Sequence, residues 1–372
     1  MDRRSWLKKG GALSALSLVS ANALASEISA YEKAKFNPRA FKTPIALNFN
    51  ENPFGPSESV RKAMTANFDA GCRYPDKMLD ELTQMIADKE GVPTNHIVIG
   101  GGSTEGLKIT GITYASNGGE IIAARPTFLA MMNYARQWGA TVNWVDLDES
   151  LTHDVDEMEK RISSKTKLVF LCNPNNPTST LLERNKLKDF VSSAAQKTIV
   201  FSDEAYYDFI EEDNYPSMVE MVKKGENVIV SRTFSKVYGL AGLRIGYLIA
   251  KPEIARKIRT NIVASSNVLA IQAAQEALRD DEFYKFSIAK TKEAKSLMYK
   301  TMDDLGLTYL QSHTNFIFFK TEKNISAFNK AMLDQGVKVG RPFPPYTDWC
   351  RISTGTIEEV KFFNEKLIQV LG

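Results

Sequence analysis

The stretch Ser231-Arg-Thr-Phe-Ser-Lys-Val-Tyr-Gly-Leu-Ala-Gly-Leu-Arg-Ile-Gly-Tyr247 is the most informative segment of this chain. One lysine, Lys236, lies between the hydroxyl residues Thr233 and Ser235, and Arg244 follows in a glycine-rich run. An amine can condense with an aldehyde, whereas hydroxyls and a guanidinium bind a phosphate group. The stretch therefore predicts a site for an aldehyde cofactor with a phosphate tail. A lone surface lysine, the ordinary alternative, does not explain the whole run.

This segment closely resembles the cofactor-lysine motif of the fold-type I pyridoxal-phosphate aminotransferases of class I and II, in particular the histidinol-phosphate aminotransferase-like branch. The resemblance covers nearly the whole chain after residue 25. It implies that pyridoxal 5′-phosphate is the cofactor, and that Lys236 both binds its aldehyde and acts as the general base. It also implies that Thr233, Ser235 and Arg244 hold the phosphate.

A glycine loop, Gly100-Gly-Gly-Ser-Thr-Glu-Gly106, follows an expected strand and opens an expected helix. Its backbone N–H groups and the hydroxyls of Ser103 and Thr104 can bind phosphate at the helix N-terminus. A dinucleotide site is the alternative, but the glycine spacing is imperfect and no acidic residue stands at the expected distance. In the resemblance, this loop holds the cofactor phosphate.

Four further residues match positions around the cofactor ring in the resemblance. Phe128 matches the aromatic residue that stacks on the pyridine ring, and Asn176 and Tyr206 match residues that hydrogen-bond the ring oxygen. Asp203 matches the carboxylate that keeps the pyridine nitrogen protonated, so that the ring accepts electrons from the substrate. A strand-terminal aspartate is often only a helix cap, but its combination with Lys236 favours the catalytic role.

Three residues are expected to bind substrate, and a fourth implies a dimer. Arg351 matches the arginine that binds the substrate's anionic group through its planar fork. Asn52, in Asn50-Glu-Asn-Pro53, matches an entrance motif at the pocket mouth. The sequence around Arg341 departs from the family pattern. Two roles are therefore open for this residue: it binds a second anionic group of the substrate, or it forms a salt bridge at the rim of the pocket. Tyr74 matches a tyrosine that reaches the cofactor phosphate of the neighbouring subunit, which implies a homodimer with shared active sites.

The first 25 residues are similar to a twin-arginine export signal. Arg3 and Arg4 precede a weakly apolar stretch that ends in Ala23-Leu24-Ala25, a small-x-small cleavage pattern. The stretch is too short and too polar for a stable membrane anchor, which needs about 20 mostly apolar residues. A basic amphipathic helix of a cytoplasmic protein is the alternative. We expect export to the periplasm with cleavage near Ala25.

The charge balance gives no reason to expect nucleic acid as a partner. The 372 residues include 47 basic and 44 acidic side chains. Residues 1–25 hold four of the basic and one of the acidic residues, so the rest of the chain is balanced at 43 of each. The apparent basicity therefore belongs to the signal. Three widely spaced cysteines indicate neither a disulfide framework nor a metal site.

Short apolar runs alternate with helical patterns between residues 58 and 250, which predicts an α/β fold. The expected strands lie at 96–99, 120–123, 141–145, 168–171, 198–202, 228–231 and 245–250. Short apolar strands separated by helices imply a mostly parallel seven-stranded sheet covered by helices on both faces. Ligands bind such sheets at the carboxyl ends of the strands.

The chain divides into four expected parts. The signal at 1–25 is followed by an arm at 26–48 that packs on the small domain or on the partner subunit. A large cofactor-binding domain spans 49–255. Residues 256–372 combine long helical patterns with a few short strands, which predicts a small C-terminal α+β domain.

The expected function is a pyridoxal-phosphate-dependent aminotransferase with a ping-pong mechanism. It moves an amino group from an amino acid or amine donor to a 2-oxo acid acceptor. A decarboxylase or carbon–sulfur lyase with the same fold and cofactor is one alternative, and an exported binding protein without catalysis is another. A nucleotide-binding oxidoreductase would rest on the glycine loop alone. Export makes histidinol phosphate a less favoured substrate, because histidine biosynthesis is expected in the cytoplasm.

Overall fold

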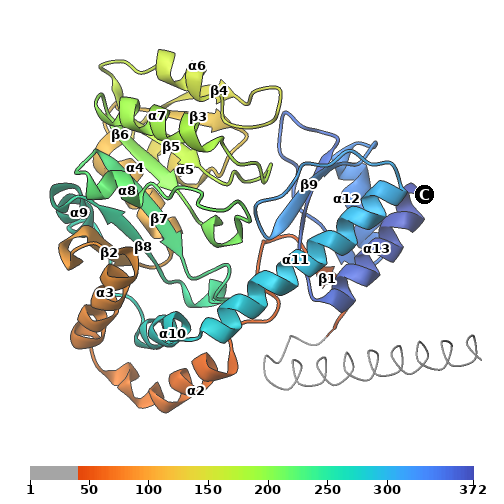
Figure 1. Cartoon of the computed structure of the whole chain (residues 1–372), viewed down its shortest axis with the longest axis horizontal. Helices are drawn as coiled ribbons and strands as arrows, with labels where there is room; N and C mark the ends of the chain where they lie inside the picture. Colours follow the sequence, from red (N-terminus) through yellow and green to blue (C-terminus); the bar gives the residue numbers. More distant parts are fainter. Residues whose placement is uncertain (1–40) are drawn as a thin grey trace, which may run out of the picture.

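The computed structural model describes residues 41–372 and has two lobes (Figure 1). Seven strands form the central sheet of the larger lobe. Their order is β2-β8-β7-β6-β5-β3-β4, and β8 alone runs in the direction opposite to the other six strands. The strands are β2 (Ile97–Gly100), β3 (Glu120–Arg125), β4 (Thr141–Asp146), β5 (Thr166–Cys172), β6 (Ile199–Asp203), β7 (Val228–Thr233) and β8 (Gly246–Ala250). All seven expected strands are present, with ends that differ by at most two residues, and the predicted fold class is confirmed.

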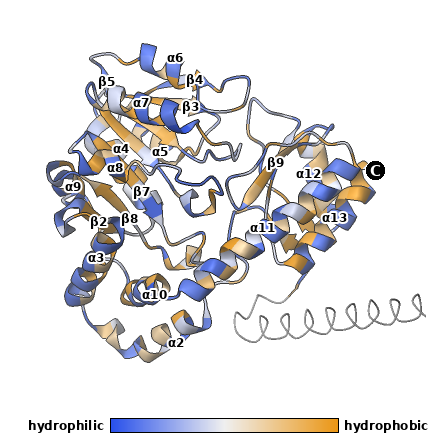
Figure 2. Cartoon of the chain, in the orientation of Figure 1, coloured by the Kyte–Doolittle hydropathy of each residue, from blue (hydrophilic) through white to orange (hydrophobic). Residues whose placement is uncertain are grey.

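Helices cover both faces of this sheet because successive residues of a strand point to opposite sides. In β3, Ile121 and Ala123 belong to one hydrophobic core and Ile122 to the other. Strands β2, β3, β5 and β8 are accordingly apolar along most of their length, whereas half of the residues of β4 and β7 are polar (Figure 2). One face is covered by α4 (Ser103–Ala115), α5 (Ala130–Arg136) and α9 (Pro252–Arg259). The other is covered by α3 (Asp76–Glu90), α6 (Val155–Lys160), α7 (Arg184–Ala195) and α8 (Val219–Lys223).

The smaller lobe surrounds a third hydrophobic core. Its strands pair as β9 (Phe316–Lys320) with β11 (Trp349–Ser353), antiparallel, and as β1 (Ile45–Ala46) with β10 (Val337–Lys338), parallel. Its helices are α12 (Ile325–Asp334), α13 (Ile357–Leu371) and the second half of α11 (Asp281–Asp304). Ile45 and Leu47 lie in this core, so the described end of the expected arm packs on the smaller lobe. The expected signal and residues 26–40 lie outside the described residues.

Helix α11 runs across both lobes (Figure 1): its Tyr284 and Ile288 pack against the core of the larger lobe, and its later residues belong to the core of the smaller one. Helix α10 (Val268–Arg279) follows the expected domain boundary at residue 255, yet its Ala270 and Ile271 lie in the core of the larger lobe. It packs there against α2 (Glu58–Ala66) and α3. Ala294 of α11 is the first helical residue of the third core.

The carboxyl ends of the strands bring chemically active residues to one edge. Cys172 and Asp203 are register partners at the ends of β5 and β6, and Thr233 ends β7 beside them. In the described part of the chain, the connections contain four short 3₁₀ helices, η1 (Phe68–Cys72), η2 (Thr94–His96), η3 (Tyr207–Phe209) and η4 (Ala241–Leu243). Within residues 41–372, no helix combines the length and apolar character that a membrane span requires.

Candidate active site

A cavity of about 520 Å³ lies at this edge of the sheet, where residues of both lobes meet. It brings together twelve of the fourteen residues that the sequence indicates for the site. They are Ser103, Thr104, Phe128, Asn176, Asp203, Tyr206, Thr233, Ser235, Lys236, Arg244, Arg341 and Arg351.

Lys236 lies three residues beyond β7, with its amine held inside the cavity. Its Nζ donates to the backbone oxygen of Asn50 at 2.8 Å and to that of Phe49 at 3.3 Å. Burial, with a smaller effect from the positive charge of Arg351, lowers the pKa of Lys236 to about 7. Much of this amine is therefore uncharged near neutral pH, and the uncharged form attacks an aldehyde.

Asp203 ends β6 and is 2% exposed. Among residues 41–372, its Oδ1 atom has no hydrogen-bond partner. Burial raises the pKa of Asp203 to about 7. A buried carboxylate oxygen without a partner is costly, and a pyridinium N–H is a donor that would satisfy it.

The first turn of α4 forms one half of a cradle whose groups can hold a phosphate. Ser103 and Thr104 begin this helix, where backbone N–H groups and the helix dipole favour an anion. The helix N-cap is Gly102, whose φ of 84° suits glycine. A Cβ atom at this position would overlap the guanidinium of Arg244. The absence of a side chain at Gly102 thus lets Arg244 approach the helix N-terminus.

The segment after β7 provides the other half of the cradle. Arg244 has a left-handed backbone, φ 56°, and its guanidinium donates to the carbonyl oxygens of Ala241 at 2.8 Å and Gly101 at 3.4 Å. Left-handed residues other than glycine are concentrated at functional sites. The Thr233 hydroxyl accepts a hydrogen bond from the Ser235 backbone N–H at 3.1 Å. Two hydroxyls, a guanidinium and a helix N-terminus therefore face one end of the cavity.

A chain of polar contacts runs along the cavity from Tyr206 through Asn176 to Arg351. The Tyr206 hydroxyl accepts from the side-chain amides of Asn50 at 3.0 Å and Asn176 at 3.2 Å. Arg351 donates to Oδ1 of Asn176 at 2.8 Å and to the backbone oxygen of Asn48 at 2.6 Å. Burial raises the pKa of Tyr206, so its hydroxyl keeps its proton and can donate into the cavity.

The family model described as aminotransferase class I and II matches residues 42–367 of this chain. The chain belongs to this family. It is 36% identical over 335 residues to a histidinol-phosphate aminotransferase of Moorella thermoacetica, covering 89% of this chain and 86% of that protein. It is also 36% identical over 336 residues to histidinol-phosphate aminotransferase 1 of Bacillus cereus, covering 88% of each. A histidinol-phosphate aminotransferase of Sinorhizobium meliloti, solved in complex with pyridoxal-5′-phosphate, is 27% identical with a TM-score of 0.81, covering 89% of this chain and 91% of that one.

The protein is a pyridoxal-phosphate-dependent aminotransferase, and its cavity fits that cofactor. When bound, the cofactor supplies an electron sink for the charge that develops at the substrate α-carbon. Asp203 would hold the ring nitrogen, and Phe128 would cover one face of the ring. Asn176 and Tyr206 would hold the ring oxygen. The Nζ atom of Lys236 would take the α-proton of the substrate and return it.

Two residues expected in the site do not line the cavity of the aminotransferase. The side chain of Asn52 donates to the Val237 backbone oxygen at 2.8 Å and to the Ser287 hydroxyl at 2.9 Å, so it joins the chain to α11. The expectation that Asn52 contacts substrate is therefore corrected, because both its donors are used elsewhere. Tyr74 is 91% exposed and lies outside the lining of this cavity.

Sequence reasoning missed several residues that line the cavity of the aminotransferase. Asn50 lies in the entrance motif, two positions before Asn52. Its residue type could have indicated the unusual backbone conformation that it adopts. Its φ of 54° is a conformation in which asparagine is enriched. Asn48 contributes a backbone oxygen, and Phe343 a ring, and neither role has a local sequence signature.

Proposed function

We propose that this aminotransferase acts on an amino substrate that is doubly anionic, through two carboxylates or a phosphate ester. The observation that carries the proposal is the sharing of one aromatic ring by two arginines. The guanidinium of Arg341 lies 4.2 Å from the ring centroid of Phe343, and that of Arg351 lies 5.0 Å from it. Two cations therefore face the same end of the cavity.

Neither arginine has its charge balanced by a carboxylate within the described residues. The hydrogen bonds of Arg341 go to the backbone oxygen of Pro342, and those of Arg351 go to amide and carbonyl oxygens. Burial lowers the pKa of Arg351 to about 10, and the neighbouring charge of Arg341 adds to that shift. Burial also lowers the pKa of Arg341. An anionic substrate would relieve both effects, and a planar guanidinium binds carboxylate or phosphate through two parallel hydrogen bonds.

The relatives favour a phosphate ester among these substrates. Proteins 36% identical to this chain are named histidinol-phosphate aminotransferases, and that amine carries a phosphate. The dicarboxylate glutamate would bind at the same two arginines as an amino donor. Both half-reactions of a ping-pong cycle would then use one anion site.

The test compares substrates of different charge in the variant Arg341→Gln. We expect kcat/KM for glutamate and for histidinol phosphate to fall about 10–100-fold, the worth of a charge-assisted hydrogen bond. Alanine, which lacks the side-chain carboxylate of glutamate, and histidinol, which lacks the phosphate, should change less than about threefold. An equal loss for all four substrates, or no loss for any, contradicts the proposal.

We also propose that the aminotransferase is a homodimer whose Tyr74 completes the site of its partner. Tyr74, Phe68 and Val263 are large side chains exposed by 91%, 69% and 85%. A second cavity of about 700 Å³, lined by Val263, adjoins the active site because Thr104 and Arg244 line both. A second copy covering this face would bury those side chains and bring a tyrosine to the phosphate end.

Subunit mixing tests the shared site. Tyr74→Ala and Lys236→Ala are each expected to be poorly active. If sites are shared, a hybrid of the two variants has one site with both lesions and one site with neither. Activity should therefore return on mixing under conditions that exchange subunits. No recovery, with hybrid formation verified by mass spectrometry, contradicts a shared site.

We propose, finally, that the aminotransferase is exported to the periplasm by the twin-arginine route. The support is the order of Arg3-Arg4, the weakly apolar stretch and Ala23-Leu24-Ala25. Cell fractionation should find the wild-type protein in the periplasm, shortened near Ala25. The double variant Arg3→Lys, Arg4→Lys should stay uncleaved in the cytoplasm. Equal distributions of the two proteins contradict export by this route.

A further inference from the structure

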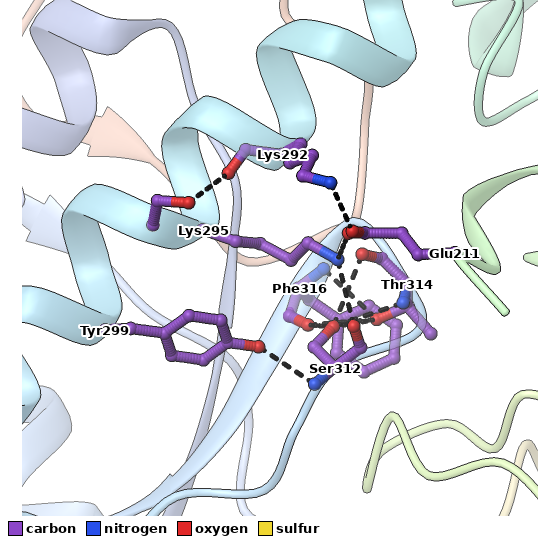
Figure 3. Close-up of polar contacts among 8 residues, drawn as sticks. Glu211, Lys292, Lys295, Tyr299, Ser312, Thr314 and Phe316 are labelled. Atoms are coloured by element: carbon purple, nitrogen blue, oxygen red, sulfur yellow. Dashed lines mark hydrogen bonds and ion pairs between the residues drawn. The ribbon is translucent and has the colours of Figure 1, made fainter.

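Lys295, on α11, is a buried lysine that the catalytic site does not use. It is 3% exposed, and lysine is almost never so buried unless it is paired. Its Nζ donates to Oε1 of Glu211 at 3.1 Å and to the backbone oxygen of Ser312 at 2.9 Å (Figure 3). One ammonium group is thus bound to two separate segments of the chain.

Both segments lead directly to the active site. Glu211 lies eight residues after Asp203, on the stretch that leaves Tyr206 through η3. Ser312 begins the loop that enters β9 at Phe316. Lys295 therefore joins a segment of the larger lobe to a loop of the smaller one.

The loop from Ser312 to Phe316 is held by its own hydrogen bonds as well. The Ser312 backbone N–H donates to the Tyr299 hydroxyl at 2.8 Å. The hydroxyls of Ser312 and Thr314 donate to the backbone oxygen of Phe316, at 2.5 Å and 2.9 Å (Figure 3). Because Ser312 is anchored by α11 on two sides, its position sets that of Phe316.

Phe316 and its neighbour contact the catalytic groups. The Phe316 ring meets the Tyr206 ring edge-on, with centroids 5.2 Å apart, and the Arg351 guanidinium lies 5.5 Å from its centroid. The side-chain amide of Asn315 donates at 3.0 Å to the backbone oxygen of Asn50. The same oxygen accepts from Lys236.

We propose that Lys295 is a positioning residue that, through Ser312 and Phe316, holds Arg351 in place for the anionic group of the substrate. The inference rests on the proposed role of Arg351. Loss of the Lys295 ammonium frees the Ser312 carbonyl and lets the loop shift. The Phe316 ring then no longer supports the guanidinium, and the substrate anion binds less tightly.

The chain offers a matched control at Lys292. This residue pairs with the same Glu211, at 2.8 Å, but its side chain is 66% exposed and makes no described bond to Ser312. Lys295→Met and Lys292→Met each remove one ammonium from Glu211. Only the first removes the bond to Ser312.

In the holoenzyme, Lys295→Met should raise KM for glutamate about tenfold, the effect of one weakened charge-assisted contact. Bound pyridoxal phosphate, measured by its absorbance, should stay near wild type. Amide hydrogens of residues 312–316 should exchange faster in mass-spectrometric measurements. Lys292→Met should match wild type in all three measurements. Equal KM values and exchange rates for the two variants overturn the proposal.

Two further variants keep the test decisive. If Lys295→Met does not fold, Tyr299→Phe removes another anchor of Ser312 with little change in packing, and it should raise KM and loop exchange in the same direction. Unchanged values for Tyr299→Phe then overturn the proposal. Arg351→Lys separates this inference from the proposed function. If Arg351→Lys leaves KM unchanged, the role of Arg351 is wrong; if it raises KM while Lys295→Met does not, the positioning role is wrong.

Discussion

The Nζ atom of Lys236 lies 2.8 Å from the backbone oxygen of Asn50, a residue 186 positions earlier in the chain. Asn50 has a left-handed backbone, and its side chain also donates to the Tyr206 hydroxyl. One residue near the start of the described chain therefore aligns both the amine and the phenol of the site. Removal of Lys236 should leave this scaffold intact, because Asn50 keeps its bonds to Tyr206 and Asn315.

Lys236→Ala should therefore abolish transamination without unfolding the protein. We expect the rate of the first half-reaction to fall by at least the roughly 10²–10⁴-fold that a positioned base contributes. Single-turnover absorbance of the cofactor measures that rate, and thermal unfolding checks the fold. Turnover comparable to wild type would show that another group takes the α-proton.

The amine of Lys236 should become reactive at a much lower pH than an ordinary lysine. Its pKa is lowered to about 7, so it loses its proton and becomes a nucleophile as the pH rises through about 7. A surface lysine, with a pKa of about 10.4, does so some three units higher. Labelling of the apoprotein with a small aldehyde and a reducing agent, followed by peptide mass spectrometry, gives the midpoint. A midpoint above about pH 9 for Lys236 contradicts the burial seen here.

Asp203→Asn should make the apoprotein more stable and the enzyme less active. The folded-state pKa of Asp203 is raised to about 7, above the ordinary value of 3.8. Its contribution to stability is therefore fully present below about pH 4 and is lost as the pH rises through about 7. Asparagine has the same shape and carries no charge to bury.

The stability difference should accordingly depend on pH. We expect the variant apoprotein to melt higher than wild type at pH 8, by about 1–2 °C for each kcal/mol regained, and to match it near pH 4. Calorimetry of both proteins gives the two values. Activity should fall sharply, because an amide cannot keep the pyridine nitrogen protonated. A variant that is less stable at pH 8 would mean that Asp203 is satisfied in the folded apoprotein.

Gly102→Ala should weaken cofactor binding by displacing Arg244. A Cβ atom at Gly102 would overlap the guanidinium, and the φ of 84° disfavours alanine. We expect the dissociation constant for pyridoxal phosphate to rise about 10–100-fold, as for loss of a charge-assisted bond. Equilibrium dialysis of the apoprotein measures this constant.

Gly242→Ala is the matched control, since a Cβ atom at Gly242 would meet nothing within 4 Å. Its dissociation constant should stay within about twofold of wild type. If both glycine variants bind the cofactor equally well, the close approach of Arg244 to the helix N-terminus does not matter for the phosphate.

Local sequence sufficed for the elements and for the groups that carry a chemical signature. Strand β6 and its terminal Asp203 could be predicted from the local sequence. A short apolar run followed by a polar residue is typical of a buried strand whose last side chain lies at the ligand-binding edge of the sheet. Lys236 and Arg244 could be placed together because they share one continuous segment. The family resemblance then assigned Phe128 and Asn176 to the cofactor ring. Without it, Phe128 would be interpreted as an ordinary core residue and Asn176 as part of a turn.

Long-range contacts account for what the sequence left open. Asn52 and Asn50 look equivalent in the chain, and only the fold directs one to α11 and the other to Tyr206. Lys295 looks like any lysine of a polar helix, and its burial follows from the meeting of α11 with two loops.

The sequence by itself determined the seven strands, and it predicted Lys236 as the cofactor lysine together with the groups for the phosphate, because strand periodicity and motif chemistry act between neighbours in the chain. Only the tertiary structure decided which asparagine faces the cavity, how Arg341 and Arg351 share Phe343, and that α10 packs with the larger lobe. These features depend on contacts between residues far apart in sequence. Such contacts are set by the packing of whole elements, which no local pattern encodes.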